Sequence, residues 1–372
     1  MNIRKVALLT GMSMLAAHAY GQGSVTLYGL INLGVGYVSN AGGKSLWAMQ
    51  NGTMQNSRWG LKGREDLGGG SSAIFTLENG FDPTNGGLNQ NGRLFGRQAF
   101  VGLANDRYGT VTFGRQYDAL IDVLSPFSAP FLSTDLSFEI GENDDTAGSF
   151  RYSNSAKYVS PLLAGFQFEG LYAFSNTAGA FSYNRASSFG LSYSNGSISA
   201  GLAYTELDRP GPANLNGAVS NDYAGAPFLL FRQSPLNPKV GVKRQSVFGG
   251  GGAYHFGAVV LSGLITDVRY QYLDGTSIHL MNYQWSTSYY LTPFLILAGG
   301  YTYTGGRYGG LAGAPHWNTV HASVDYLLSK RTDVGLEVLY DKSTGGQADI
   351  VPQTPSTSGN QTVAFVSIRH KF

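Results

Sequence analysis

The 372-residue sequence contains no cysteine, which excludes disulfide bonds and leaves backbone pairing and side-chain packing to stabilise the fold. Charged residues are scarce: they make up 13% of the chain, against about 25% in typical soluble domains. Beyond the N-terminal segment, no apolar run reaches the roughly 20 residues that a membrane-spanning helix needs. A disulfide-rich secreted domain, an ordinary charged soluble domain and a helical membrane protein therefore all fit poorly.

The N-terminus predicts a secretory signal peptide over residues 1–19. Arg4 and Lys5 precede a short apolar run that ends in Ala17-His18-Ala19, a small-residue cleavage site. The run is too short for a membrane anchor, and cleavage after Gly21 is the alternative. Loss of the two basic residues leaves 23 basic and 23 acidic residues, so the mature chain is near neutral and no nucleic-acid partner is expected.

Aromatic residues and glycine are what the chain has in excess, with 23 Tyr, 21 Phe and 52 Gly. An exported chain that is rich in Tyr and Gly and poor in charge favours an outer-membrane β-barrel, because only helices and closed barrels satisfy every backbone polar group in hydrocarbon. Residues 24–37 illustrate the pattern. Val25, Leu27, Ile31 and Val35 share one face, and small or polar residues occupy the other, as expected between lipid and water.

The same alternation recurs along the chain, with short turns and long loops following one another as in outer-membrane barrels. Sixteen antiparallel strands in one domain, residues 22–372, are predicted. The predicted strands are 24–37, 57–64, 72–78, 94–103, 110–117, 150–159, 166–174, 187–194, 197–207, 245–255, 258–270, 278–291, 295–303, 317–328, 332–340 and 362–372.

Residues 118–149 form the longest stretch without a convincing strand in the first half of the chain. Compact folds rarely keep a structureless loop of this length unless it has a function. We expect this third external loop to fold back into the barrel and narrow it. The other long loop, residues 208–243, is rich in Pro, Gly and Asn and is predicted to be external.

Several motifs, taken in order, resemble the trimeric general porins of Gram-negative bacteria, and the beta-proteobacterial branch in particular. They are Ser24-Val-Thr-Leu-Tyr-Gly29, Ser57-Arg-Trp-Gly-Leu-Lys-Gly-Arg-Glu-Asp-Leu-Gly68, Leu94-Phe-Gly-Arg-Gln-Ala-Phe-Val-Gly-Leu103, Phe113-Gly-Arg-Gln116, Arg151-Tyr-Ser-Asn-Ser155, Leu328-Ser-Lys-Arg-Thr332 and Ile368-Arg-His-Lys-Phe372. The resemblance implies a sixteen-stranded barrel in the outer membrane, assembled as a homotrimer. Residues 79–92 would contact a neighbouring subunit.

The resemblance also implies a constriction between wall arginines and the third loop. The wall residues are Arg58, Arg97 and Arg151, with Arg115 and Lys62 as further candidates. Arg115 shares strand parity with Val111 and Phe113, which are predicted to face lipid. Arg97 shares parity with Val101, but a charge facing mid-membrane lipid costs about 2–4 kcal/mol, so Arg97 is placed inward and Phe100 outward. The acidic candidates on the loop are Asp118, Asp122, Asp135 and Glu139, whereas Glu142, Asp144 and Asp145 are predicted to be solvated loop charges.

The predicted function is passive diffusion of small hydrophilic solutes and ions, with mild anion preference from the close-packed arginines. Lipid and lipopolysaccharide are expected at the outer surface. No cofactor, metal or catalytic residue is predicted, because no histidine occurs in a nucleophile or metal-ligand motif. The alternatives are a substrate-specific channel with an aromatic lining, an outer-membrane enzyme, and a structural barrel with a blocked lumen.

Overall fold

The computed structural model describes residues 23–128, 136, 138–211, 216–219, 223 and 230–372. The predicted signal peptide and Asp135 lie outside these residues. Among the described residues no helix has the length and apolar character required to cross a membrane.

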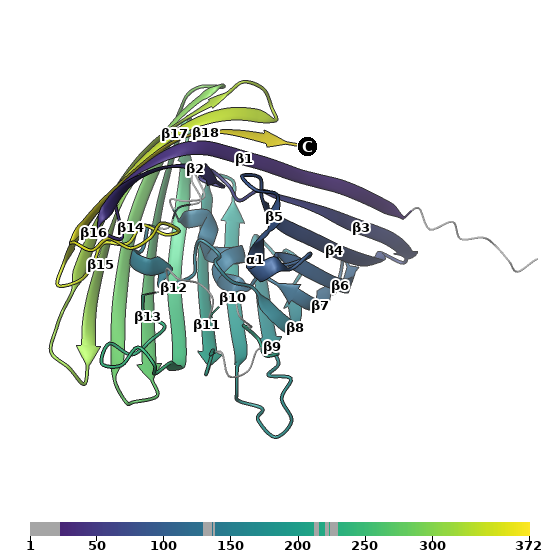
Figure 1. The fold of residues 1–372 in the computed structure, drawn as a ribbon. Helices are drawn as coiled ribbons and strands as arrows, with labels where there is room; N and C mark the ends of the chain where they lie inside the picture. Colours follow the sequence, from purple (N-terminus) through teal and green to yellow (C-terminus); the bar gives the residue numbers. More distant parts are fainter. Residues whose placement is uncertain (1–22, 129–135, 137, 212–215, 220–222, 224–229) are drawn as a thin grey trace, which may run out of the picture.

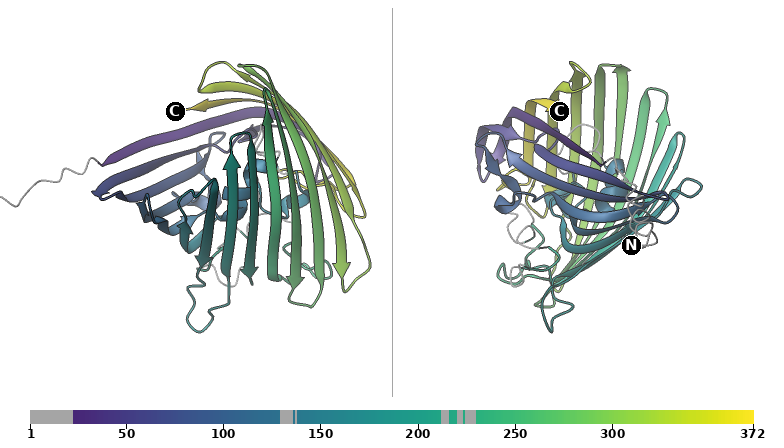
Figure 2. Two further views of the ribbon diagram at one scale, coloured as in Figure 1. Left: turned by 180° about the vertical axis from the view of Figure 1, so that it is seen from behind. Right: turned by 90° about the vertical axis from the view of Figure 1, so that its right-hand side faces the viewer.

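The described chain is dominated by one antiparallel sheet that closes on itself (Figures 1 and 2). Closure is made by β1 and β18, which pair from Leu30 opposite Lys371 to Val38 opposite Val363. The strands are β1 (Ser24–Ala41), β2 (Lys44–Asn51), β3 (Arg58–Gly68), β4 (Ser71–Asp82), β5 (Gly87–Leu88), β6 (Gln98–Asn105), β7 (Gly109–Gln116), β8 (Tyr152–Val159), β9 (Phe166–Ala173), β10 (Arg185–Asn195), β11 (Ile198–Asp208), β12 (Val242–Phe256), β13 (Val259–Tyr272), β14 (Ser277–Thr292), β15 (Leu295–Gly309), β16 (His316–Leu327), β17 (Thr332–Thr344) and β18 (Asn360–Lys371).

Two of these strands do not add a strand position to the barrel wall. β3 pairs with the first half of β1, and β2 pairs with its second half, so together they fill one position in the wall. β5 has two residues and belongs to a loop. With these two set aside, sixteen strands form the wall, which confirms the predicted count. β2 was not predicted from the sequence; its residues lie between the predicted strands 24–37 and 57–64.

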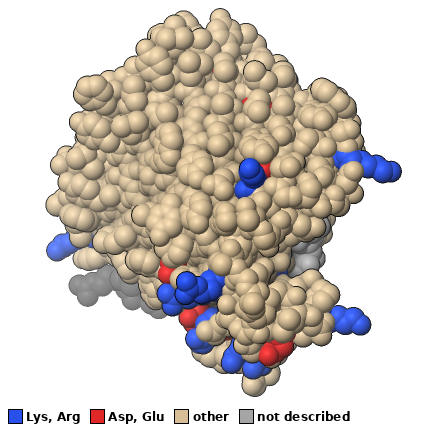
Figure 3. All heavy atoms as spheres, turned by 90° about the vertical axis from the view of Figure 1, so that its left-hand side faces the viewer, with Lys and Arg blue, Asp and Glu red and all other residues tan. Residues whose placement is uncertain are grey.

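Alternation between lipid and lumen holds along the wall. In β16, Val320 and Val324 are exposed on the outside, whereas Thr319, His321 and Ser323 are buried on the inside. Figure 3 shows one side of the molecule, where charged side chains are few: most gather toward one end, with a small group near the middle and single basic side chains at the edges. A sheet with this surface is suited to hydrocarbon, because apolar side chains meet lipid and every ladder hydrogen bond is made between strands.

Most of the segment between β7 and β8, residues 118–150, is called the inner loop below. It contains the short helical turns η2 (Leu120–Leu124), η3 (Ser125–Phe127) and η4 (Ile140–Glu142). Its described residues pack against the inner face of the sheet, where Leu124 and Phe127 join an apolar cluster with inward side chains of β11, β12 and β13. Figures 1 and 2 show these turns within the curve of the sheet.

Glycines on the inner face allow this close packing. A Cβ atom at Gly249 would lie 2.6 Å from Leu124 Cδ1, and one at Gly251 would lie 3.0 Å from Phe127 Cβ. The Gly249–Gly252 run therefore marks a stretch of wall that another part of the chain approaches closely, as glycine within a strand predicts. The inward-facing glycines of the run set how far the inner loop stands from the wall.

Candidate functional site

A continuous chain of hydrogen bonds joins side chains from the wall on the β1–β8 side. Tyr28 donates to Glu78 Oε2 at 3.0 Å, and Arg97 Nε donates to Glu78 Oε1 at 2.7 Å. Arg97 Nη2 and Arg151 Nη2 then both donate to the hydroxyl oxygen of Tyr117, the first at 2.8 Å. Two of the predicted arginines are thereby held together, although both carry positive charge.

Arg58 completes this group from the start of β3. Its Nε lies 3.9 Å from Glu78 Oε2, and its side chain is 20% exposed, more than that of Arg97. Arg97 and Arg151 are only 7% and 3% exposed. Lys62, on the same face of β3, lies over the Tyr28 ring at 5.3 Å. The structure thus brings Arg58, Arg97 and Arg151 together and places Lys62 beside them.

The prediction for the strand that follows Arg97 needs a correction. β6 begins at Gln98, so Arg97 lies before the strand and is free of its alternation. Within β6, Val101 and Leu103 are exposed on the outside and Gly102 is buried. Phe100 shares the inner face with Gly102, so the predicted outward orientation of Phe100 is wrong.

Arg115 turns inward because β7 ends in a bulge. The pairing of β7 with β8 shifts register between Gly114 and Gln116, and Gly114 has a φ of +140°. A bulge reverses which face a side chain takes, which explains why simple parity placed Arg115 toward lipid. Its Nε donates to the Gly96 carbonyl at 2.8 Å and its Nη1 donates to Ser153 Oγ at 2.8 Å. Arg115 therefore braces the backbone behind the other arginines.

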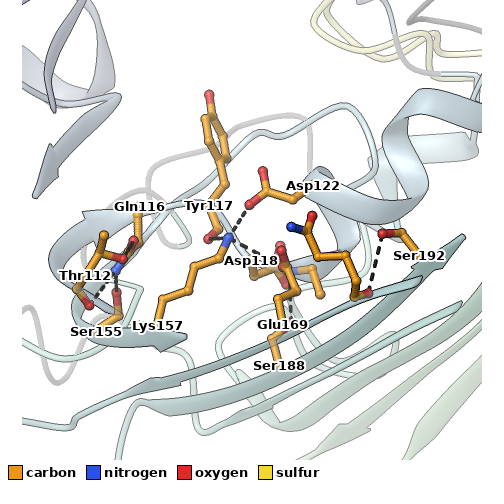
Figure 4. Close-up of polar contacts among 12 residues, drawn as sticks. Thr112, Gln116, Tyr117, Asp118, Asp122, Ser155, Lys157, Glu169, Ser188 and Ser192 are labelled. Atoms are coloured by element: carbon orange, nitrogen blue, oxygen red, sulfur yellow. Dashed lines mark hydrogen bonds and ion pairs between the residues drawn. The ribbon is translucent and has the colours of Figure 1, made fainter. Parts of the chain in front are cut away.

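The first acidic residues of the inner loop bind the wall. Lys157 of β8 donates to Asp122 and to the Tyr117 carbonyl, and its Nζ lies 3.4 Å from Glu169 Oε1 (Figure 4). Asp122 is partly exposed and lines a cavity of about 250 Å³ with Glu169. Figure 4 shows the Tyr117 ring pointing away from this cluster. Lys157 thus tethers the start of the inner loop.

Asp118 is fully buried beside β11. Thr205 Oγ1 donates to Asp118 Oδ2 at 2.5 Å, and burial raises the pKa of Asp118 to about 6. A buried carboxyl of this kind is more easily protonated than an exposed one, because desolvation disfavours the charged form. Asp118 and Asp122 therefore both contact the wall near their own end of the loop.

The later acidic residues of the loop are all buried, which corrects the prediction of solvated charges there. Gln284 of β14 donates to Glu139 Oε1 at 2.9 Å, and Thr266 of β13 donates to Asp144 Oδ2 at 2.7 Å. Asp145 Oδ1 accepts from two backbone N–H groups of the loop, and burial raises its pKa well above the ordinary value. Glu142 is also buried. These carboxyl groups fasten the loop and hold its shape.

The lumen has a further ion group on the β16–β18 side. Arg369 Nη2 lies 2.6 Å from Asp333 Oδ2 and 3.5 Å from Asp325 Oδ2. Within the described residues this group places two carboxylates around one guanidinium. Its arginine therefore adds no net positive charge to the wall.

Three residues of the site were not identified from the sequence: Glu78, Tyr117 and Lys157. Glu78 and Lys157 are charged residues in predicted strands, and the cost of a charge facing lipid was a signal that both must face the lumen. Tyr117 carries no comparable signal, since tyrosine occurs on both faces of such strands. Its role depends on where the chain leaves β7.

Comparison with known proteins identifies the family from the sequence. A family model described as Gram-negative porin matches residues 6–346. An outer membrane porin protein of Bordetella pertussis is 38% identical over 230 residues, which cover 54% of this chain and 58% of that protein. Outer membrane porin protein 32 of Delftia acidovorans is 30% identical over 300 residues, 75% of this chain and 74% of that protein.

Solved structures share the fold. An anion-selective porin from Comamonas acidovorans superposes with a TM-score of 0.76 at 24% identity, covering 94% of this chain and all of that one. The trimer form of OmpT from Vibrio cholerae superposes with a TM-score of 0.69 at 15% identity, covering 94% of this chain and 99% of that one. The chain belongs to the Gram-negative porin family and is a porin of the outer membrane.

Proposed function

We propose that the chain is a general diffusion porin for small hydrophilic solutes and ions with a mild preference for anions. Its constriction lies between the inner loop and the wall that carries Arg58, Arg97 and Arg151. The sharper selectivity of a substrate-specific channel is the alternative. No catalytic role is proposed.

The observation that supports anion preference is the charge of the described arginine cluster. The guanidinium groups of Arg58 and Arg97 lie beside one carboxylate, that of Glu78, and Tyr117 joins Arg151 to Arg97. Asp118 and Asp122 are bound to the wall elsewhere. Fixed charges that line a narrow pore determine which ions enter it. An excess of arginine therefore favours anions. The structural neighbour from Comamonas acidovorans is an anion-selective porin, which agrees with this direction.

Two measurements test the proposal. The reversal potential of the purified protein in a planar bilayer under a KCl gradient should have the sign of chloride preference, and a cation preference would contradict it. Liposome swelling with a size series of neutral sugars should decline smoothly with solute size. A sharp optimum for one solute would support the substrate-specific alternative instead.

Assembly as a homotrimer embedded in outer-membrane lipid and lipopolysaccharide is part of the proposal. The trimer form of the Vibrio neighbour supports it, and residues 79–92 are the proposed contact with the next subunit. Beyond the end of β4 at Asp82, this segment carries β5 and the short turn α1 (Asn89–Gly92). Crosslinking in detergent should give a trimer, and deletion of residues 83–91 should weaken it. A stable monomer in the unchanged protein would refute this part.

A further inference from the structure

The hydroxyl of Tyr117 occupies an unusual position between two arginines. Its oxygen accepts from Arg97 Nη2 at 2.8 Å and from Arg151 Nη2. The Arg151 guanidinium also lies over the Tyr117 ring, 4.7 Å from its centroid. Figure 4 shows the ring directed away from the Lys157 cluster, so this hydroxyl belongs to the arginine side of the inner loop.

The hydrogen-bond capacity of a phenol decides what this hydroxyl can still do. A tyrosine hydroxyl has one proton to donate and two lone pairs that accept. Two arginine donors use both lone pairs. Within the described residues no acceptor takes the Tyr117 proton, so the hydroxyl is left as a donor only.

Arg151 supplies a second unused donor. Its Nη1 donates to the Ser149 carbonyl at 3.2 Å and its Nη2 donates to Tyr117, but its Nε is buried and has no hydrogen-bond partner among the described residues. Arg151 as a whole is 3% exposed. This N–H group is enclosed by the protein, so the Tyr117 hydroxyl is the donor on which the proposal rests.

We propose that the Tyr117 hydroxyl, held between Arg97 and Arg151, forms a small anion subsite in the pore, and that Tyr117 is a specificity-determining residue. The ligands it fits are small oxyanions, such as a short carboxylate or inorganic phosphate, because these accept several hydrogen bonds at once. The inference rests on the proposed anion preference, and it adds the Tyr117 hydroxyl as the group that donates a hydrogen bond to the acceptor atoms of the ion.

The arrangement explains how a neutral side chain can contribute to selectivity. An ordinary hydroxyl can turn a lone pair toward a cation or a proton toward an anion. Because both lone pairs of Tyr117 are held by Arg97 and Arg151, only the proton can be offered. Tyr117 can therefore donate a hydrogen bond to a permeating anion. It has no free lone pair to replace a water molecule that a permeating cation loses from its hydration shell.

The test is the Tyr117→Phe variant, which keeps the ring beneath Arg151 and removes only the oxygen. We expect the acetate-to-chloride permeability ratio to fall about threefold or more, because one hydrogen bond to the anion is lost. Inorganic phosphate should also block chloride current less strongly. Swelling rates with neutral sugars should stay the same, since the pore radius changes little.

A control variant and a measurement on the unchanged protein distinguish failure of the proposed subsite from failure of the proposed function. Tyr301→Phe removes a phenol that donates to Asn318 on the outward side of β15, and it should leave every permeability ratio unchanged. If the unchanged protein shows no anion preference, the proposed function fails. If it prefers anions but Tyr117→Phe retains the acetate ratio and the phosphate block, the subsite is refuted while the proposed function stands.

Discussion

Glu78 Oε1 lies 2.7 Å from Arg97 Nε, and the opposite carboxylate oxygen accepts the hydroxyl proton of Tyr28. Glu78 is thus the carboxylate that pairs with Arg58 and Arg97, and it stands on the wall rather than on the inner loop. It lowers the positive charge that a permeating ion meets, and it fixes the direction of Arg97.

Replacing Glu78 by glutamine should increase anion preference. The substitution keeps the shape and one acceptor oxygen while raising the local charge by one. Interactions of about 1 kcal/mol or more are expected between charges this close in a partly buried site, so the chloride-to-potassium permeability ratio should rise at least about twofold. Glu65→Gln, at an exposed position of β3, is the control. An unchanged ratio in Glu78→Gln would show that permeating ions do not sense this cluster.

Replacing Lys157 by methionine should release the start of the inner loop. Lys157 pairs with Asp122 and Glu169, and removal of one partner from a buried pair costs about 3–5 kcal/mol. Because the Asp122 side chain is 40% exposed, solvent screening places the expected loss at about 3 kcal/mol or less. A lower unfolding temperature in detergent and noisier open-channel current should result.

The control for that variant is Lys239→Met, which changes an exposed loop residue. Lys157→Arg keeps the charge and should retain most of the stability. Equal unfolding temperatures for Lys157→Met and Lys239→Met would argue against the tether.

Asp118 predicts a pH dependence of stability. Its pKa in the folded protein is raised to about 6 by burial, above the ordinary value near 4. Below pH 4 this group is protonated in both the folded and the unfolded state, so its ionisation does not affect the free energy of unfolding there. As the pH rises through 6, the folded state comes to hold a buried carboxylate, and on the order of 3 kcal/mol is lost.

The Asp118→Asn variant should consequently unfold at a higher temperature than the unchanged protein at pH 8 and at the same temperature near pH 4. Asp274→Asn serves as the comparison, because hydrogen bonds from Ser234 and Thr276 lower the pKa of Asp274 and its substitution should not stabilise at pH 8. A stabilising effect of Asp118→Asn that is equal at both pH values would refute the assigned cause.

A side chain at Gly249 should push the inner loop into the lumen. A Cβ there would lie 2.6 Å from Leu124 Cδ1, and overpacking typically costs about 1–3 kcal/mol. Gly249→Val should lower both the unfolding temperature and the single-channel conductance. Gly263→Ala, whose nearest atom is the Gln284 carbonyl oxygen at 3.6 Å, should change neither. Full conductance in Gly249→Val would mean that the loop does not border the conducting path.

The sequence alone was sufficient for most of the barrel wall, although not for β2, because a two-residue period follows directly from lipid on one side and water on the other. It failed where the chain leaves that period. Arg97 lies before its strand and Arg115 follows a bulge at Gly114, so parity placed neither correctly without an added argument.

The inner loop was harder to predict than the wall for a different reason. Its acidic residues were expected in water or across the pore, but Asp144 and Glu139 are bound to Thr266 and Gln284 on distant strands. Such contacts join residues more than 100 positions apart, and local sequence contains no signal for them. The apolar cluster beneath the loop is equally non-local.

The measurement that tests the account most directly is the reversal potential in a KCl gradient, made on the unchanged protein and on the variant with Arg58, Arg97 and Arg151 all replaced by alanine. We expect a potential of the sign of chloride preference in the unchanged protein, and a potential that falls to zero or reverses in the variant. A cation-selective potential in the unchanged protein, or an identical potential in a correctly folded variant, would contradict it.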